Sequence, residues 1–282
     1  MSSNFQADTV YGVDFSAAAN SAGASTWVAR CVQDGEELVV NKLASASEYL
    51  DIDSNDRSDV LPALADHLGS GTESTVAGLD FPFSLPEWVL SQSNGWREFV
   101  QATPDQWGIL EQVDEPKDLF YRLNAQAEET KNPQRRATDD EHKGQNPAGW
   151  RIKTQTYYGI SILLRRLIEF DQVAVPPVLT HQNPRLTVLE TYPASVFDDL
   201  EDATRTGYKK GQRRHVEARQ QNVEALQEAG VRFADQTARD CAVATDDALD
   251  AVAAAYAAHR NYPEALTEEY DQQARLEAQI FA

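Results

Sequence analysis

The sequence is poor in cysteine and has no long hydrophobic segment. Cys31 and Cys241 are the two cysteines, and neither belongs to a C-x-x-C pair, so neither a disulfide framework nor a zinc cage is expected. No run of about 18 apolar residues occurs, so no membrane-spanning helix is predicted. The segment Met1–Asp8 is polar and lacks an apolar signal core, which predicts a protein without a secretion signal that stays in the cytoplasm.

Positive charge is also scarce. The chain of 282 residues has 25 Lys plus Arg against 45 Asp plus Glu, a net charge of −20, and only seven of the basic residues are lysines. Dense carboxylates keep a protein hydrated when molar salt screens their mutual repulsion, so this composition is typical of a high-salt cytoplasm. An acidic protein that binds basic partners is the alternative. Overall acidity is therefore only weak evidence against nucleic-acid binding.

The apolar pattern predicts alternating strands and helices in a single α/β domain that spans residues 1–282. Five strand-like runs are present: Val10–Asp14, Ser25–Val32, Glu37–Leu43, Ser74–Leu79 and Leu186–Glu190. The turn signal Asp34-Gly35 joins the second run to the third, and Arg57–Leu68 has apolar residues at helical spacing. We therefore expect a mixed five-stranded sheet flanked by helices.

Residues 83–183 interrupt this alternation, because they are rich in Trp, Gln, Pro and charge. Their clearest element is Thr154–Phe170, which has an apolar helical face, whereas Lys131–Gly149 has the Pro and Gly content of a mobile loop. We predict a large, mostly helical insertion that covers the working end of the sheet. Beyond it, Gly211–Ala229 should form a charged helix and Asp246–His259 a strongly apolar one.

Three acidic residues, Asp14, Asp80 and Glu190, stand at or just after the ends of predicted strands. Ligands of open α/β sheets bind at the carboxyl ends of the strands. One such acid would be explained more simply as a cap of the following turn or helix. Three in one chain favour a shared site.

The apolar helix carries two further acids, Asp247 and Asp250, which share a helical face because they lie three residues apart. Asp250 falls within the buried part of this helix, where an unpaired carboxylate is costly. A divalent cation between hard oxygen ligands would remove the repulsion between the two groups. A buried Arg partner for Asp250 is the alternative.

These motifs together resemble those of a known family. They are Gly12-Val13-Asp14-Phe15-Ser16, Gly78-Leu79-Asp80-Phe81-Pro82, Glu190-Thr191-Tyr192-Pro193-Ala194 and Asp246-Asp247-Ala248-Leu249-Asp250-Ala251. The pattern resembles the DUF429 family, whose members are described as predicted RNase H-like nucleases, and the resemblance covers most of the chain. The Asp247-x-x-Asp250 helix is also similar to the last helix of RuvC-type Holliday-junction resolvases.

This resemblance implies an RNase H-like fold and metal-dependent hydrolysis of phosphodiester bonds in DNA or RNA. Asp14 would bridge two Mg²⁺ or Mn²⁺ ions, Asp80 and Asp247 would flank it, and Asp250 with Glu190 would complete the second ion or orient its water. Asp80 departs from the RuvC pattern, which has Glu at that point, and Glu190 has no clear RuvC counterpart. A homodimer is compatible with the resemblance, because such resolvases pair to cut two strands.

Basic residues are concentrated in one segment, where Arg205, Lys209, Lys210, Arg213, Arg214 and Arg219 occupy six of 15 positions. Binding of nucleic-acid phosphates is one interpretation, and a solvated helix face that pairs with Glu217 and Glu224 is the other. Arg135 and Arg136, and Arg165 and Arg166, are further candidate phosphate ligands. Trp96, Trp107 and Trp150 are candidates for base stacking, with core packing as the alternative.

Two other classes of function share this fold. A phosphotransferase of the actin-like kind would need glycine-rich phosphate loops and a duplicated domain, and neither these nor a G-x-x-x-x-G-K-[ST] motif is present. A non-catalytic module that binds a small molecule or nucleotide stays open. The metal-site hypothesis requires Asp14, Asp80, Asp247 and Asp250 to surround one point. An Asp250 that is paired with an arginine far from Asp14 would refute it.

Overall fold

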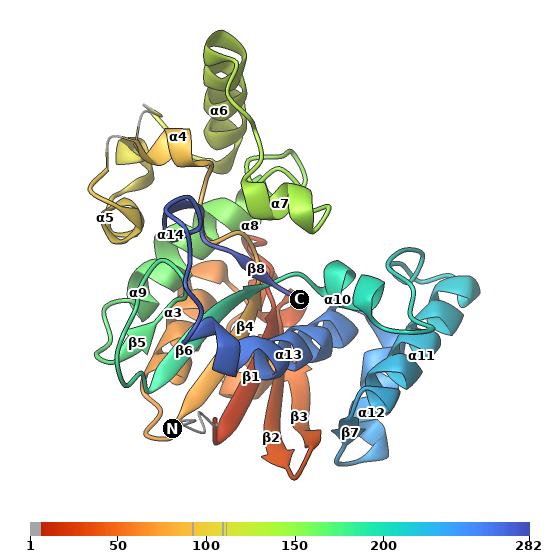
Figure 1. The fold of residues 1–282 in the computed structure, drawn as a ribbon. Helices are drawn as coiled ribbons and strands as arrows, with labels where there is room; N and C mark the ends of the chain where they lie inside the picture. Colours follow the sequence, from red (N-terminus) through yellow and green to blue (C-terminus); the bar gives the residue numbers. More distant parts are fainter. Residues whose placement is uncertain (1–6, 92, 109, 111) are drawn as a thin grey trace.

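The computed structural model describes residues 7–91, 93–108, 110 and 112–282, and Figure 1 shows their fold. Most of the Met1–Asp8 segment, for which no secretion signal was predicted, lies outside these residues. Among the described residues, none of the helices combines the length and the apolar character that a membrane span requires.

The described strands form one eight-stranded sheet in the order β5-β6-β4-β1-β2-β3-β7, and β8 pairs with β6. The five predicted strands are all present, as β1 (Thr9–Asp14), β2 (Trp27–Asp34), β3 (Glu37–Ser45), β4 (Thr75–Asp80) and β6 (Leu186–Thr191). The first three form an antiparallel meander, and β4 and β6 run parallel to β1 on its other side. This is the predicted RNase H-like mixed α/β arrangement.

The predicted number of strands is wrong, because the sheet gains three short strands at its edges. These are β5 (Val173–Ala174), β7 (Val231–Phe233) and β8 (Ile280–Phe281). Each has only two or three residues, too few for alternation of apolar and polar positions to be recognised. Their pairing with β6 or β3 defines them, and such pairing depends on the tertiary structure.

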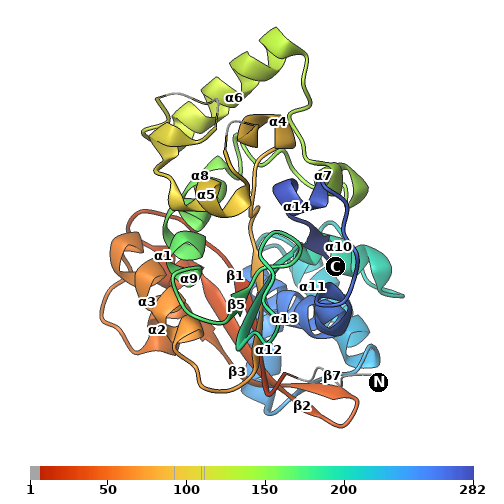
Figure 2. The ribbon, with the colours of Figure 1, turned by 60° about the vertical axis from the view of Figure 1, so that its left-hand side comes forward.

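Helices cover both faces of the sheet, and Figure 2 shows the sheet between the two layers. One layer contains α1 (Ala22–Ser25), α2 (Ala46–Leu50) and α3 (Arg57–Gly69). The other contains α10 (Pro193–Asp199), α11 (Arg213–Glu228), α12 (Gln236–Ala244) and α13 (Asp246–Ala265). Each layer has its own hydrophobic core, because alternate strand residues point to opposite faces: Val13 and Leu79 to the α3 side, Val10 and Val76 to the α13 side.

Helix α13 lies unusually close to the strands, because two glycines face it. Gly12 of β1 and Gly78 of β4 are neighbours in the parallel register. A Cβ atom at Gly12 would collide with the backbone of Ala251 and Ala255, and one at Gly78 with the carbonyl oxygen of Ala254. Small residues on both sides therefore allow the helix backbone to rest on the sheet. The acidic first turns of α13 are thereby held beside the ends of β1 and β4.

The predicted helical region lies between β4 and β5. It consists of α4 (Glu87–Leu90), α5 (Trp96–Gln101), the 3₁₀ turn η1 (Pro104–Gln106), α6 (Pro116–Thr130), α7 (Ala137–Glu141), α8 (Lys153–Tyr158), the π-helical η2 (Gly159–Leu164) and α9 (Arg165–Leu167). Helices α4, α5 and α6 form the end of the molecule beyond the carboxyl ends of β1 and β4 in Figures 1 and 2. The predicted helix Thr154–Phe170 corresponds to α8, η2 and α9 in succession, and α9 packs against α3.

The predicted loop Lys131–Gly149 contains α7, and the C-terminal α14 (Ala274–Glu277) packs against that helix. The side chain of Glu277 accepts hydrogen bonds from the backbone N–H groups of Glu87 (2.7 Å) and Ala137 (2.9 Å). The C-terminal segment therefore ties the helical region to the sheet edge where β8 pairs with β6.

Candidate functional site

Asp14 and Asp80 lie side by side because the last residues of β1 and β4 are partners in the parallel register. Both have the same position in the strand alternation as Gly12 and Gly78, so their side chains point to the α13 face. Asp250 of α13 joins them there. One carboxylate oxygen from each of the three residues lies within 4.8 Å of those of the other two.

Asp247 and Asp250 reach this point because of how α13 begins. The Thr245 hydroxyl caps the helix by accepting a hydrogen bond from the N–H of Ala248 at 3.3 Å. Asp247 in the first turn is partly exposed and faces the cavity, whereas the Asp250 carboxylate, one turn further along, is only 1% exposed. We call Asp14, Asp80, Asp247 and Asp250 the aspartate cluster.

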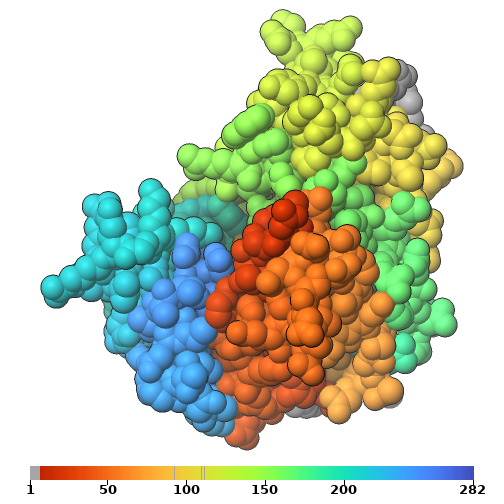
Figure 3. All heavy atoms as spheres, turned by 180° about the vertical axis from the view of Figure 1, so that it is seen from behind, coloured from red at the N-terminus to blue at the C-terminus, as the bar shows by residue number. Residues whose placement is uncertain are grey.

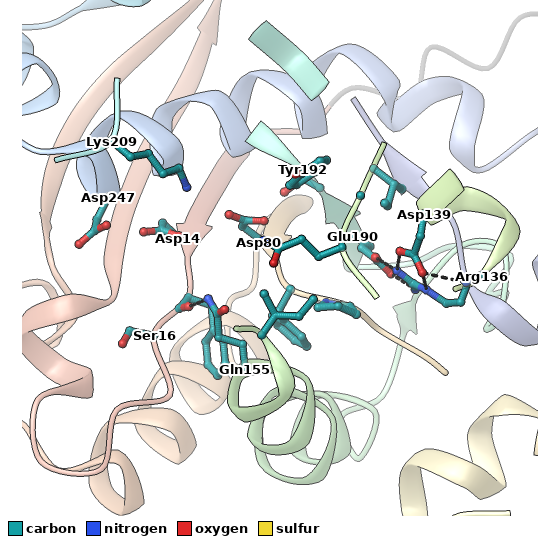
Figure 4. A pocket seen from close by; sticks show the side chains of 18 of the residues that line it. Asp14, Ser16, Asp80, Arg136, Asp139, Gln155, Glu190, Tyr192, Lys209 and Asp247 are labelled. Atoms are coloured by element: carbon teal, nitrogen blue, oxygen red, sulfur yellow. Dashed lines mark hydrogen bonds and ion pairs between the residues drawn. The ribbon is translucent and has the colours of Figure 1, made fainter. Parts of the chain in front are cut away.

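Three members of the aspartate cluster, Asp14, Asp80 and Asp247, line a cavity of about 250 Å³. Figure 4 shows them with Lys209 on one side and Tyr192 and Gln155 on the others. The Gln155 amide of α8 donates a hydrogen bond to the carbonyl oxygen of Phe15 at 2.6 Å, which fixes the helical region against the end of β1. The cavity thus lies between the strand ends, α13 and α8.

The electrostatics of the aspartate cluster favour a bound cation. Burial raises the pKa of Asp14 well above its usual range, and the neighbouring charges of Asp250, Asp80 and Asp247 raise it further. The pKa of Asp80 is raised to about 7, with burial again as the main cause. Burial also raises the pKa values of Asp247 and Asp250. Carboxylate oxygens are the ligands that Mg²⁺ and Mn²⁺ prefer, so these residues fit a divalent ion of this class.

Asp250 has two protein partners as well. The Lys209 Nζ atom lies 2.7 Å from its Oδ2 atom, and the Tyr208 hydroxyl donates a hydrogen bond to its Oδ1 atom at 2.9 Å. The alternative to a metal ion was a buried arginine beside Asp250, and the structure has a lysine there instead. Asp250 nevertheless lies beside Asp14, so three of the four acids that the metal-site hypothesis names, Asp14, Asp80 and Asp250, come together. Lys209 was predicted to bind phosphate, but in the structure it contacts a carboxylate.

Glu190 lies apart from the aspartate cluster because of the strand alternation. It pairs in register with Leu79, not with Asp80, so its side chain points to the opposite face of the sheet. There the Arg136 guanidinium binds it, with Nη2 at 2.5 Å from Oε1 and Nη1 at 2.8 Å from Oε2, and the N–H of Phe83 donates to Oε2 at 2.9 Å. Figure 4 shows this pair beyond Asp80. Sequence reasoning placed Glu190 with the other acids because strand register cannot be read from one sequence.

Arg136 also binds Asp139 through Nη2 and Nε, at 2.7 and 3.1 Å. Its side chain is fully buried, and we call Arg136, Asp139 and Glu190 the Arg136 cluster. Because the guanidinium is occupied by two carboxylates, the structure does not present Arg136 as the phosphate ligand that was predicted. Arg135 points outward, and its half-exposed side chain lies 3.4 Å from that of Asp140.

The remaining predicted basic residues divide into an exposed and a buried set. Lys210, Arg213 and Arg214 are exposed at the start of α11, and the surrounding segment projects from the body of the molecule in Figure 3 (cyan). Arg213 pairs with Glu217 at 3.0 Å, as the alternative of a solvated helix face predicted. Arg205 and Arg219 donate mainly to backbone carbonyl oxygens and support the local chain.

The tryptophans also differ in exposure. Trp96 and Trp107 are buried, 2% and 0% exposed, which confirms core packing for both. Trp150 is 60% exposed, and Lys153 Nζ lies 3.7 Å from the centroid of its ring. The ring of Trp150 also packs edge-to-face against Phe120 of α6, with ring centroids 5.5 Å apart. Arg166, by contrast, is engaged with Asp66 on α3, at 2.5 Å.

Sequence reasoning missed Tyr208, Gln155 and Asp139 as parts of this region. Tyr208 precedes the Lys209-Lys210 pair and is buried, so an aromatic residue inside a basic segment was its only signal. Gln155 stands at the start of a helix whose apolar face alone was considered. Asp139 follows Arg136 by three residues, a spacing typical of a local ion pair.

Comparison with known proteins yields a family and no individual relative. No curated protein matches the chain, and no solved structure does. A family model described as "Protein of unknown function (DUF429)" matches residues 12–275, a range that contains both clusters. The chain therefore belongs to the DUF429 family, as its motifs indicated.

Proposed function

We propose that this protein hydrolyses phosphodiester bonds with the help of Mg²⁺ or Mn²⁺ held by the aspartate cluster. The observation that carries the proposal is the convergence of Asp14, Asp80 and Asp250 from β1, β4 and α13 within 4.8 Å. These elements are the first strand, the fourth strand and the last long helix of the sheet domain. In the RuvC-type resolvases, which the motifs resemble, the acidic residues of the active site stand on the corresponding elements.

The chemistry follows from the charges. A bound divalent ion lowers the pKa of a coordinated water and neutralises charge on the phosphoryl oxygens. Water adds to phosphorus, the ester bond from phosphorus to oxygen breaks, and the leaving oxygen takes up a proton. Asp247 is suited to accept a hydrogen bond from the attacking water, since it faces the cavity and is partly exposed. The buried Asp14 and Asp250 are suited to holding the ion.

The family resemblance implies two ions. Three carboxylates that each offer one oxygen support one shared ion directly. A second ion would need further ligands from Asp247 and from water.

Nucleic acid is the substrate class that the surroundings favour. Lys210, Arg213 and Arg214 are exposed basic residues that follow the cavity-lining Lys209 closely in the sequence of a protein whose net charge is −20. Phosphate contacts weaken steeply with salt, so in a high-salt cytoplasm they would contribute little affinity. Stacking of bases depends less on salt, and the exposed ring of Trp150 offers a surface for it.

A non-catalytic binding module is the second candidate, and one observation favours it. Without any ion, Tyr208 already donates a hydrogen bond to one oxygen of Asp250, and the Lys209 ammonium lies beside the other. Such a module would keep the fold and the cavity and would bind a small phosphorylated molecule or a nucleotide.

Cleavage of a labelled panel in molar KCl tests the proposal. The panel holds single-stranded DNA, duplex DNA, RNA, an RNA–DNA hybrid and a four-way junction, each with Mg²⁺, Mn²⁺ or a chelator. We expect metal-dependent cutting that Asp14→Asn abolishes. The matched control is Asp246→Asn, which removes an acid from the same helix, outside the aspartate cluster, and should still cut.

The other outcomes are equally informative. Metal binding in calorimetry without cutting of any panel member would contradict the nuclease proposal and favour the binding module. Absence of both cutting and metal binding would leave only the fold.

A further inference from the structure

Lys209 is the basic residue that reaches into the aspartate cluster. Its Nζ atom lies 2.7 Å from Asp250 Oδ2, while its side chain remains 55% exposed. Lys209 also lines the same cavity as Asp14, Asp80 and Asp247, so its ammonium group belongs to the aspartate cluster. It occupies a place where a metal ion would also be attracted.

The backbone around Lys209 is fixed by a buried arginine. Arg219 is 2% exposed, and its Nη1 atom donates to the carbonyl oxygens of Tyr208 (2.6 Å) and Lys210 (2.8 Å), one on each side of Lys209. Its other nitrogens donate to the carbonyl oxygens of Val243 (2.7 Å) and Ala244 (3.0 Å), just before α13. One side chain thus ties the Lys209 segment to the start of the helix that bears Asp250.

The conformation of this segment is also unusual. Lys210 has a φ angle of +110°, a region that non-glycine residues seldom adopt and that persists only when surrounding contacts impose it. Tyr208 is buried with its hydroxyl on Asp250, Lys209 points at the same carboxylate, and Lys210 is exposed. The fold therefore fixes the position of Lys209, which is not a side chain that rotates freely at the surface.

We infer that Lys209 is a built-in cation of the aspartate cluster, so that the site takes one divalent ion per chain and not two. The inference rests on the proposed metal-dependent function. The single ion would lie among the oxygens of Asp14, Asp80 and Asp250. With Lys209 and one divalent ion, the four carboxylates of the aspartate cluster are left with a formal charge of −1, so a second divalent ion would make the cluster positive, and repulsion opposes its binding in this buried setting. Lys209 supplies there the positive charge that a second ion would supply.

Ion counting tests this inference independently of activity. Mn²⁺ is titrated into the full chain in molar KCl, and the bound ions are counted by calorimetry and by electron paramagnetic resonance. The variants are Lys209→Met, which keeps the length and removes the charge, and Lys209→Arg, which keeps the charge. Lys210→Met is the matched control, because it removes the neighbouring, exposed lysine.

We expect one Mn²⁺ per chain for the wild type, Lys209→Arg and Lys210→Met, and two for Lys209→Met. Two ions on the wild type, or one on Lys209→Met, would overturn the inference while leaving the proposed metal-dependent function intact. No ion on the wild type or on any variant would overturn both. Circular dichroism of Lys209→Met must match that of the wild type. If Lys209→Met does not fold, the count on the wild type still decides, because two ions there overturn the inference.

Discussion

Two groups of buried acids lie at the same end of the sheet and are neutralised in different ways. In the Arg136 cluster, one fully buried guanidinium binds Asp139 and Glu190, and backbone N–H groups of Phe83 and Arg136 complete the hydrogen bonding. In the aspartate cluster, four carboxylates share one partly exposed ammonium, that of Lys209. The Arg136 cluster carries a formal charge of −1 and the aspartate cluster, with Lys209, of −3.

This difference shows that burial of an acid does not by itself mark a metal site. Glu190 is as deeply buried as Asp250, and burial raises the pKa of both. What separates them is how much of the negative charge the fold neutralises. The Arg136 cluster is complete as a structural link between the helical region and β6, whereas the aspartate cluster has charge left to be neutralised and a cavity beside it.

The largest effect on stability is expected from Arg136→Met. Removal of one partner from a buried ion pair leaves uncompensated charge and typically costs about 3–5 kcal/mol. We expect thermal unfolding in chelator to show this loss in the free energy of unfolding. The triple variant Arg136→Met, Asp139→Asn, Glu190→Gln removes the charges together and should recover a large part of it. A loss for Arg136→Met that matches that of an exposed substitution, about 0.5 kcal/mol or less, would contradict a structural role for this cluster.

A smaller effect, directed at the aspartate cluster, is expected from Gly12→Ala. The added Cβ collides with the α13 backbone at Ala251 and Ala255, and overpacking of this kind typically costs about 1–3 kcal/mol. Because α13 must move, Mn²⁺ affinity measured by calorimetry should fall together with stability. Gly211→Ala is the control, since a Cβ there meets open space. Unchanged Mn²⁺ affinity in a destabilised Gly12→Ala would show that α13 does not position the ligands.

The third prediction concerns the dependence of stability on pH. The pKa of Asp80 is raised in the folded protein to about 7, so between about pH 4 and pH 7 the folded state binds more protons than the unfolded state. Stability that is present below pH 4 is therefore lost as the pH rises through 7. Asp80→Asn has no carboxyl group to ionise at this position, so it does not lose this stability. In chelator at pH 8 it should therefore have a higher melting temperature than the wild type, by about 2–4 °C for each kcal/mol of difference in the free energy of unfolding.

Metal addition and a second variant serve as controls for this prediction. Mg²⁺ should raise the melting temperature of the wild type at pH 8 and have little effect on Asp80→Asn. Glu190→Gln should instead lower the melting temperature, because it weakens an existing ion pair with Arg136. An Asp80→Asn that melts lower than the wild type in chelator would mean that the aspartate cluster is balanced without a metal ion.

The fold and part of the site could be predicted because they rest on local patterns. Strand-like runs of five or more residues marked β1 to β4 and β6, and the three-residue spacing of the two acids in the last long helix placed Asp247 and Asp250 on one face. The edge strands β5 and β8 could not be found, since pairs of residues carry no period. Glu190 was grouped with Asp14 and Asp80 because the sequence shows that all three stand at strand ends. The sequence does not show that Glu190 is in register with Leu79, one residue before Asp80, which turns its side chain to the other face of the sheet.

The sequence by itself determined the family, the mixed α/β class, and the identity of the acids that end β1, β4 and the first turns of α13. Those are consequences of residue type and spacing along one element. Only the tertiary structure decided which acids meet, that Arg136 neutralises Glu190, and that Lys209 reaches Asp250 from a distant segment. These contacts join residues more than 40 positions apart, and they depend on strand register and on the close packing of α13 over Gly12 and Gly78.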